Sequence, residues 1–126
     1  MGLDLTISVQ SDFGTDEQGR YTYKVTHLCN LRNCYAIFDQ LGYRLESGFS
    51  NCATYTFYGE TFHDILKDMQ EELTELTELS KVQELTDYQQ SRMGILSDEI
   101  SELEDFIETN NVPNDDTQDY QVHAWW

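Results

Sequence analysis

The amino-acid sequence predicts an α+β fold with a small, mainly antiparallel sheet of about four strands, one short helix and a long helical hairpin or coiled-coil-like segment. Apolar and polar residues alternate near both ends of the chain, which is typical of half-buried strands. In residues 60–110 the apolar residues instead recur every three or four positions, as they do along packed helices. The 126 residues are enough for a single domain, 1–126, which we divide into segments 1–59, 60–110 and 111–126.

The first segment begins with two predicted strands. Leu3–Gln10 alternates between apolar and polar side chains, and Tyr21–Leu28 does the same. A polar, glycine-containing connector, residues 11–20, lies between them. We therefore expect an antiparallel hairpin with a long loop.

A short helix and a third strand complete segment 1–59. The helix is predicted from apolar residues at helical spacing, which are Leu28, Leu31, Tyr35, Phe38 and Leu41. Thr26 or Asn30 could cap its start, and Gly42 would stop it. Asn51–Gly59 is rich in Tyr, Thr and Phe, which favours a strand.

Segment 60–110 reads as helical, but one straight helix does not fit its pattern. Two heptad-like runs flank a stretch in which the apolar residues are each three apart, namely Leu73, Leu76, Leu79, Val82 and Leu85. Each step of three moves the apolar stripe back by roughly 60° around a helix. We expect a reversal between Thr77 and Asp87, followed by a capping box from Thr86 to Gln89. The alternatives are one long bent helix, or a continuous helix wrapped by partners such as a second copy.

The last segment contains a loop and a fourth predicted strand. Asn110–Asp119 is polar and holds the single proline of the chain. Tyr120–Trp126 alternates, so it should return to the sheet. Because neighbouring strand residues point to opposite faces, one of Trp125 and Trp126 can pack inward while the other serves as an interface anchor. Alternatively, both cover the edge of the helices.

The charge of the chain is strongly negative and unevenly distributed. The formal net charge is −17, with 24 acidic and 7 basic residues. Residues 60–110 hold fifteen acidic and three basic residues, a net of −12, whereas residues 1–59 have a net of −2. Such a charge argues against direct binding of nucleic acid or an anionic membrane, since both are negative. It favours a basic protein surface as the partner.

Acidic residues of the helical segment, together with the two tryptophans, are the candidate binding residues. Carboxylates on successive helical turns form a row at intervals of about 5–6 Å, which could occupy a Lys/Arg groove meant for phosphate. The candidates are Glu71, Glu72, Glu75, Glu78, Asp98, Glu99, Glu102, Asp105, Trp125 and Trp126. The alternative is an ordinary solvated acidic surface.

The chain offers little for catalysis or metal binding. His27, Cys29, Cys34 and Cys52 lack the CxxC pairs of structural zinc sites, so the cysteines fit better as small apolar residues. The acidic loops Asp12–Gly19 and Asn111–Asp119 lack the residue order of an EF-hand. We expect no cofactor, no metal and no catalytic residue. An enzyme therefore ranks third, after the two functions given below.

The opening residues "MGLDLTI", followed by "YKVTHL" and a short amphipathic helix, resemble small uncharacterised proteins encoded by bacteriophages. Thr26, His27 and Leu28 match a Thr-His-Asn-Leu-type turn, whereas Cys29 departs from the pattern. The resemblance covers about the first forty residues and implies no catalytic residues. By physical type, the small acidic chain is similar to phage anti-restriction and anti-CRISPR inhibitors.

These observations lead to one functional hypothesis and one alternative. We expect a non-enzymatic, phage-derived inhibitor that mimics DNA and occupies the basic nucleic-acid-binding surface of a host defence protein. The alternative is a structural protein that forms a homodimer through its leucine seam as a coiled coil. The odd number of cysteines, and the lack of a signal peptide or a long apolar run, favour the host cytoplasm.

Overall fold

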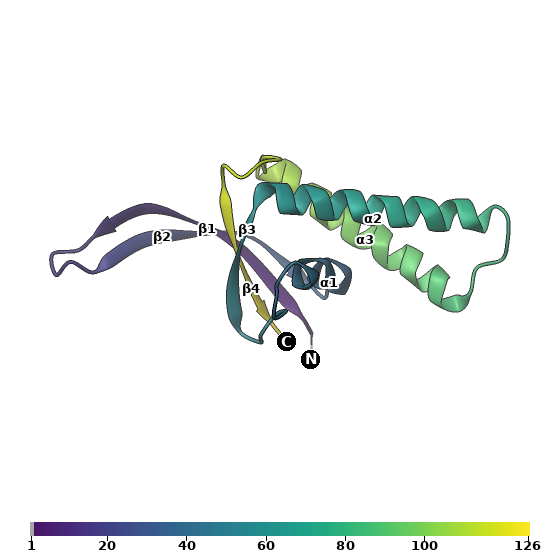
Figure 1. The fold of residues 1–126 in the computed structure, drawn as a ribbon, viewed down its shortest axis with the longest axis horizontal. Helices are drawn as coiled ribbons and strands as arrows, with labels where there is room; N and C mark the ends of the chain where they lie inside the picture. The colour runs from purple at the N-terminus through teal and green to yellow at the C-terminus, as the bar shows by residue number, and fades with distance from the viewer. Residues whose placement is uncertain (1) are drawn as a thin grey trace.

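The structure, a computed structural model, describes residues 2–126 as two layers: a four-stranded antiparallel sheet with three helices on one face (Figure 1). The strands are β1 (Asp4–Thr15), β2 (Tyr21–Arg32), β3 (Ala53–Tyr58) and β4 (Asp119–Trp125). Their order across the sheet is β2-β1-β4-β3, and all three pairings are antiparallel. The predicted α+β class and the four strands are therefore confirmed.

The alternation seen in the sequence places one face of the sheet in the core. Leu5 and Ile7 of β1 are fully buried, and they are paired in register with Ala124 and Val122 of β4. The helices cover these side chains and complete a two-layer core. The other face of the sheet is open, and its groove is lined by polar residues such as Ser8 and by the exposed side chains of Tyr23, Val25 and Trp125.

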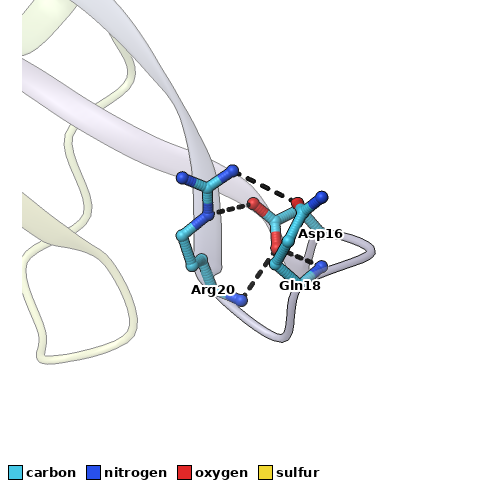
Figure 2. Close-up of polar contacts among 3 residues, drawn as sticks. All are labelled: Asp16, Gln18 and Arg20. Atoms are coloured by element: carbon cyan, nitrogen blue, oxygen red, sulfur yellow. Dashed lines mark hydrogen bonds and ion pairs between the residues drawn. The ribbon is translucent and has the colours of Figure 1, made fainter.

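The hairpin of β1 and β2 extends beyond the rest of the sheet as a two-stranded ribbon (Figure 1). Its turn is held by Asp16, whose carboxylate accepts hydrogen bonds from the backbone N–H of Arg20 at 2.8 Å and of Gln18 at 2.9 Å (Figure 2). The Arg20 Nε also donates to this carboxylate at 2.8 Å. These bonds, led by that from the Arg20 backbone, lower the pKa of Asp16. Strand β1 thus continues to Thr15, and the predicted connector of residues 11–20 is too long.

Helix α1 (Tyr35–Tyr43) starts later than the sequence predicts, because β2 continues to Arg32. The register of β1 and β2 shifts between Ile7 and Ser8, which skips Leu28. Such a bulge changes the face on which the following side chains lie. Because of the bulge, Leu31 is buried although it belongs to a strand. Its spacing of three residues from Leu28 resembles the spacing of apolar residues along a helix. The prediction of a helix from Leu28, capped by Thr26 or Asn30, was therefore wrong.

Helices α2 (Gly59–Ser80) and α3 (Asp87–Thr109) form the predicted hairpin, and its distal half projects past the sheet and α1 (Figure 1). The reversal lies between Ser80 and Asp87, which confirms the predicted break. The capping box is present as well: Gln89 N donates to Thr86 Oγ1 at 3.1 Å, and Thr86 N donates to Gln89 Oε1 at 2.9 Å. A single bent helix is excluded.

The start of α2 is fixed by close contact with the loop before β4. Gly59 is buried there, and any side chain at this position would collide with the carbonyl oxygen of Pro113. The hairpin is thereby joined to the sheet at its base. None of the helices within residues 2–126 combines the length and the apolar character needed to cross a bilayer.

Candidate functional site

Six acidic residues form one stripe along α2, because steps of three and four residues return to the same side of a helix. This α2 stripe consists of Glu60, Asp64, Asp68, Glu71, Glu75 and Glu78, all of them exposed. Lys67 lies at its edge. Like charges one turn apart destabilise an isolated helix by roughly 0.2–0.5 kcal/mol per pair, so the stripe does not serve the stability of α2.

A shorter stripe runs along α3. This α3 stripe consists of Asp98, Glu102 and Asp105, which are exposed and separated by steps of four and three. Glu102 also accepts a hydrogen bond from Cys34 Sγ at 2.8 Å. The α3 stripe borders two surface hollows, one shared with residues 32–35 and the other with residues 28–31. It therefore faces the β2 side of the molecule.

The two helices contact each other through other side chains. Arg92 of α3 binds Glu72 of α2 with two bonds, Nε to Oε2 at 2.6 Å and Nη2 to Oε1 at 3.1 Å. Gln70 Nε2 donates to Glu104 Oε1 at 3.4 Å. These polar contacts lie on both sides of the interface between α2 and α3. They therefore show which side of each helix faces the other helix.

The α2 and α3 stripes consequently lie on opposite flanks of the hairpin. Successive residues are rotated by about 100° around the helix axis. By this measure, the mean direction of the α2 stripe is roughly 170° from the direction midway between Gln70 and Glu72, which contact α3. The α3 stripe is likewise roughly 170° from the midpoint of Arg92 and Glu104. Each stripe therefore points away from the partner helix. The hairpin presents two rows of carboxylates, one along each outer edge, rather than one continuous ridge.

Most of the carboxylates on the two flanks keep their charge uncompensated. The pairs within the stripes are Arg44–Asp68 at 3.4 Å and Lys81–Glu78 at 3.1 Å, both between exposed groups. Within residues 2–126, no ion pair involves the carboxylates of Glu71, Glu75, Asp98 or Asp105. Pairs as exposed as these contribute little, typically below about 1 kcal/mol. The flanks thus remain strongly negative.

Glu99 does not belong to this surface, and its expected role as a binding residue needs correction. Its side chain is only 5% exposed. One carboxylate oxygen accepts from Ile37 N at 2.9 Å and the other from Ala36 N at 3.2 Å, in the first turn of α1. Glu72 is likewise engaged within the chain, by Arg92. Both carboxylates hold the helices together.

The two tryptophans, at the end of β4 and directly after it, lie on opposite faces of the sheet, as their adjacent positions predict. Trp125 borders the groove on the open face, and 51% of it is exposed. Trp126 lies on the helix side, with its ring centroid 5.4 Å from that of Phe38, and 43% of it is exposed. Neither is fully covered within the chain.

Cys29 and Cys34 are suited to packing rather than to metal binding or nucleophilic attack, whereas Cys52 is exposed, so the expectation that it packs as a small apolar residue was wrong. Burial, followed by the nearby charge of Glu102, raises the pKa of Cys29 to about 11. Burial and the hydrogen bond to Glu102 raise the pKa of Cys34 further. Both thiols stay protonated at neutral pH, whereas the thiolate is the form that binds metals and attacks electrophiles. Among residues 2–126, no three His, Cys, Asp or Glu side chains gather as a metal site would require.

Sequence reasoning missed two parts of this surface. The α2 stripe extends towards the sheet through Glu60, Asp64 and Asp68, and their spacing of four could have shown it. An aromatic pocket beside α1 was also missed, because residues far apart in the sequence contribute to it. Comparison of the chain with protein families, with curated proteins and with solved structures finds no match.

Proposed function

We propose that the protein is a non-enzymatic acidic binding protein, which uses the helical hairpin to occupy a basic, nucleic-acid-binding surface of another protein. The observation that carries this proposal is the pair of exposed carboxylate stripes on opposite flanks of a projecting arm. Duplex DNA also presents its negative charges in two rows, one on each strand. A groove or cleft that clamps a duplex from both sides would meet carboxylates on both sides of the hairpin.

The proposal explains why the hairpin accepts like-charge repulsion along both helices. Mixed Glu and Lys residues would keep it hydrated without that cost. A single-signed surface attracts a basic partner over long distances and accelerates association, an effect that salt weakens. The arm of 22 and 23 residues per helix is roughly 33 Å long, which is enough to span several phosphates of a duplex.

The narrower form of the proposal concerns the partner. The N-terminal resemblance to phage proteins and the acidic character together favour an inhibitor of a host defence protein, of the anti-restriction or anti-CRISPR type. DNA-cleaving enzymes of those systems carry the basic grooves that the hairpin would fit.

A second candidate function, self-association through the leucine seam, has less support. Leu73 and Leu76 are half-buried and pack against the core within the same chain. The seam is thus largely used to join α2 to α3. Sedimentation over a range of concentrations separates the two functions, because a tight dimer without a basic partner would favour self-association.

The test compares two charge reversals of equal size. In the hairpin variant, Glu71, Glu75, Asp98 and Asp105 are changed to Lys. In the control variant, four exposed acidic residues outside the hairpin are changed to Lys: Glu17, Glu46, Asp116 and Asp119. Each variant gains eight units of positive charge, so each has a formal net charge of −9 instead of −17.

Binding to restriction and CRISPR nucleases is measured by interferometry at low and high salt. We expect the wild-type protein to bind at least one of them, to be displaced by duplex DNA, and to bind more weakly in high salt. The hairpin variant should lose at least about tenfold in affinity, about 1.4 kcal/mol, and the control variant far less. Equal losses in both variants, or binding that neither salt nor DNA affects, would refute the proposal.

A further inference from the structure

The aromatic pocket beside α1 is a second binding feature of the molecule. It has a volume of about 650 Å³, within the range of ligand sites, and its lining residues are Leu3, Tyr35, Phe38, Asp39, Gly42, Phe49 and Trp126. Four of these are aromatic and one is acidic. The pocket therefore combines aromatic side chains with the carboxylate of Asp39.

The aromatic rings are arranged as walls around this space. Phe38 and Phe49 are stacked, with ring centroids 4.8 Å apart and an angle of 16° between their planes. Trp126 meets Phe38 edge-on at 5.4 Å and 69°. Its backbone N–H donates to Asn51 Oδ1 at 2.8 Å, which fixes the residue at the rim. Tyr35, which is 49% exposed, lies at the opening.

Gly42 allows the stacked pair to lie close to α1. A side-chain carbon at this position would be 3.3 Å from Phe49 Cδ2, closer than ordinary contact. The pocket is thus built from four separate parts of the chain: Leu3, α1, the loop before β3, and Trp126 after β4. Because Phe38 and Phe49 stack directly on each other, the open space lies beside this pair and not between its rings.

The carboxylate of Asp39 gives the pocket its preference for a cation. Asp39 is exposed, and within residues 2–126 no ion pair compensates its charge. The face of an aromatic ring attracts a cation through its quadrupole, and a nearby carboxylate adds to this attraction. The net charge of −17 further raises the local concentration of cations.

The pocket is continuous with the acidic hairpin. Asp39 borders both the pocket and a neighbouring hollow, and that hollow also includes Asp68 of the α2 stripe. The hollow is also lined by Arg44, which pairs with Asp68, and by Arg92. A protein that lies along the α2 flank would reach the pocket across this hollow.

We propose that this aromatic pocket takes up an arginine side chain of the basic partner, as an anchor beside the α2 stripe. This inference rests on the proposed function. Arginine fits better than lysine, because its flat guanidinium stacks on aromatic faces and pairs with a carboxylate through two parallel bonds. The hairpin supplies long-range attraction, whereas the pocket supplies a specific contact beside it.

The experiment uses a small probe, so it does not depend on identifying the partner. N-acetyl-arginine amide is titrated into the full chain labelled with ¹⁵N, and the indole N–H signals of both tryptophans are followed by NMR. N-acetyl-citrulline amide, which is neutral and nearly the same shape, is the matched probe. We expect saturable shifts at Trp126, and binding of the citrulline probe about tenfold weaker or more.

Two variants and one control assign the binding to the pocket. Asp39→Asn should weaken the arginine probe several-fold, and Trp126→Leu should do the same by removing a ring face. Trp125→Leu changes the neighbouring residue on the opposite face of the sheet, so it should leave the affinity unchanged. Because Asp39 is exposed, its variant tests the idea even if Trp126→Leu perturbs folding.

The outcomes separate this inference from the proposed function. Equal binding of the arginine and citrulline probes, or no shift at Trp126, would overturn the pocket proposal and leave the hairpin proposal untouched. The hairpin variant should still bind the arginine probe to within about twofold, because its four substitutions lie outside the pocket. If the hairpin variant binds nuclease normally while the probe results hold, the hairpin proposal fails; the pocket is then an arginine-binding site, but the basic partner of the hairpin is ruled out as the source of that arginine.

Discussion

Glu99 is the residue whose role in the structure differs most from the role that the sequence predicted. Helix α1 begins after Cys34, whose side chain makes no capping hydrogen bond, and the first turn contains no acidic residue. The carboxylate of Glu99, on α3, accepts the hydrogen bonds of two backbone N–H groups that would otherwise lack partners. A capping group from a distant helix thus fixes the place of α1 below the hairpin.

The protonation of Glu99 is coupled to folding. Burial raises its pKa above the ordinary value of 4.5, against the opposing effect of the bonds from Ile37 and Ala36. The folded state therefore binds this proton more tightly than the unfolded state does. It follows that the contribution of Glu99 to stability is largest at low pH and decreases as the pH rises through the raised pKa.

We predict that Glu99→Gln destabilises the protein by roughly 1–3 kcal/mol, because the amide can accept from only one of the two N–H groups and leaves the other unsatisfied. Urea unfolding from about pH 5 to about pH 8 provides the measurement. Since the variant cannot titrate, its deficit relative to the wild type should shrink as the pH rises. Glu75→Gln, at an exposed position, is the control and should change stability by less than about 0.5 kcal/mol. A deficit that grows with pH would contradict the assignment.

At the residue level, the sequence identifies the acidic residues but not their individual roles. Glu99 and Asp98 are neighbours of the same charge, yet one is buried and the other exposed. Their difference arises from the position of α1, which is 62 residues away along the chain. Periodicity within one helix contains no information about that contact, so the role of Glu99 could not be predicted.

At the level of elements, the hairpin helices α2 and α3 were predicted best, because local chemistry determines the ends that meet at the reversal. The hydroxyl of Thr86 and the amide of Gln89 are only three residues apart, and their reciprocal bonds define the start of α3. The slip of the leucine stripe similarly favoured a reversal of the chain. Both signals lie within a few residues, and both are confirmed by the structure.

We predict that Thr86→Ala lowers the free energy of unfolding by about 1 kcal/mol, the usual cost of losing an N-cap. Urea denaturation is suitable, with Thr74→Ala as the control. Thr74 is exposed in the middle of α2 and bonds only to the preceding turn, through Gln70 O. Alanine is the better helix former there, so the control should be neutral or slightly more stable. Similar stability of the two variants would show that the capping box contributes nothing.

The strands were predicted less accurately than the helices, and the cause is a register shift. The bulge at Leu28 depends on which residue of β1 lies opposite, and that partner is about twenty residues earlier in the chain. After a bulge, inward residues no longer follow the alternation of the first part of a strand. The end of β2 thus resembled the beginning of a helix.

At the level of the whole molecule, the charge is known from the sequence but its distribution is not. Whether the stripes of α2 and α3 form one ridge or two flanks depends on which sides of the helices face each other. Contacts such as Arg92–Glu72 determine this, and they become known only once the helices are packed. The candidate carboxylates were thus mostly correct as exposed groups, whereas their assumed arrangement was not.

Self-repulsion should make the stability of the whole chain depend on salt. We predict that Tm rises with sodium chloride between about 0.01 M and about 0.1 M, as the screening length falls from about 30 Å to about 10 Å. Differential scanning fluorimetry measures the slope. The control variant, with its net charge of −9, should show a smaller rise than the wild type, whose net charge is −17. A wild-type Tm that is flat or falls in this range would mean that the negative charges are compensated.

The strand order β2-β1-β4-β3 determines when, during synthesis of the chain, the sheet can form. Because β4 lies in the centre, the β1–β2 hairpin and β3 share no sheet until residues 119–125 have left the ribosome. A nascent chain halted before them would hold two unjoined fragments with bare edges. Completion is therefore a late and concerted event, and such long-range pairing slows folding. Throughout synthesis, the early strands would have to rely on chaperones or on their own polar edges to avoid aggregation.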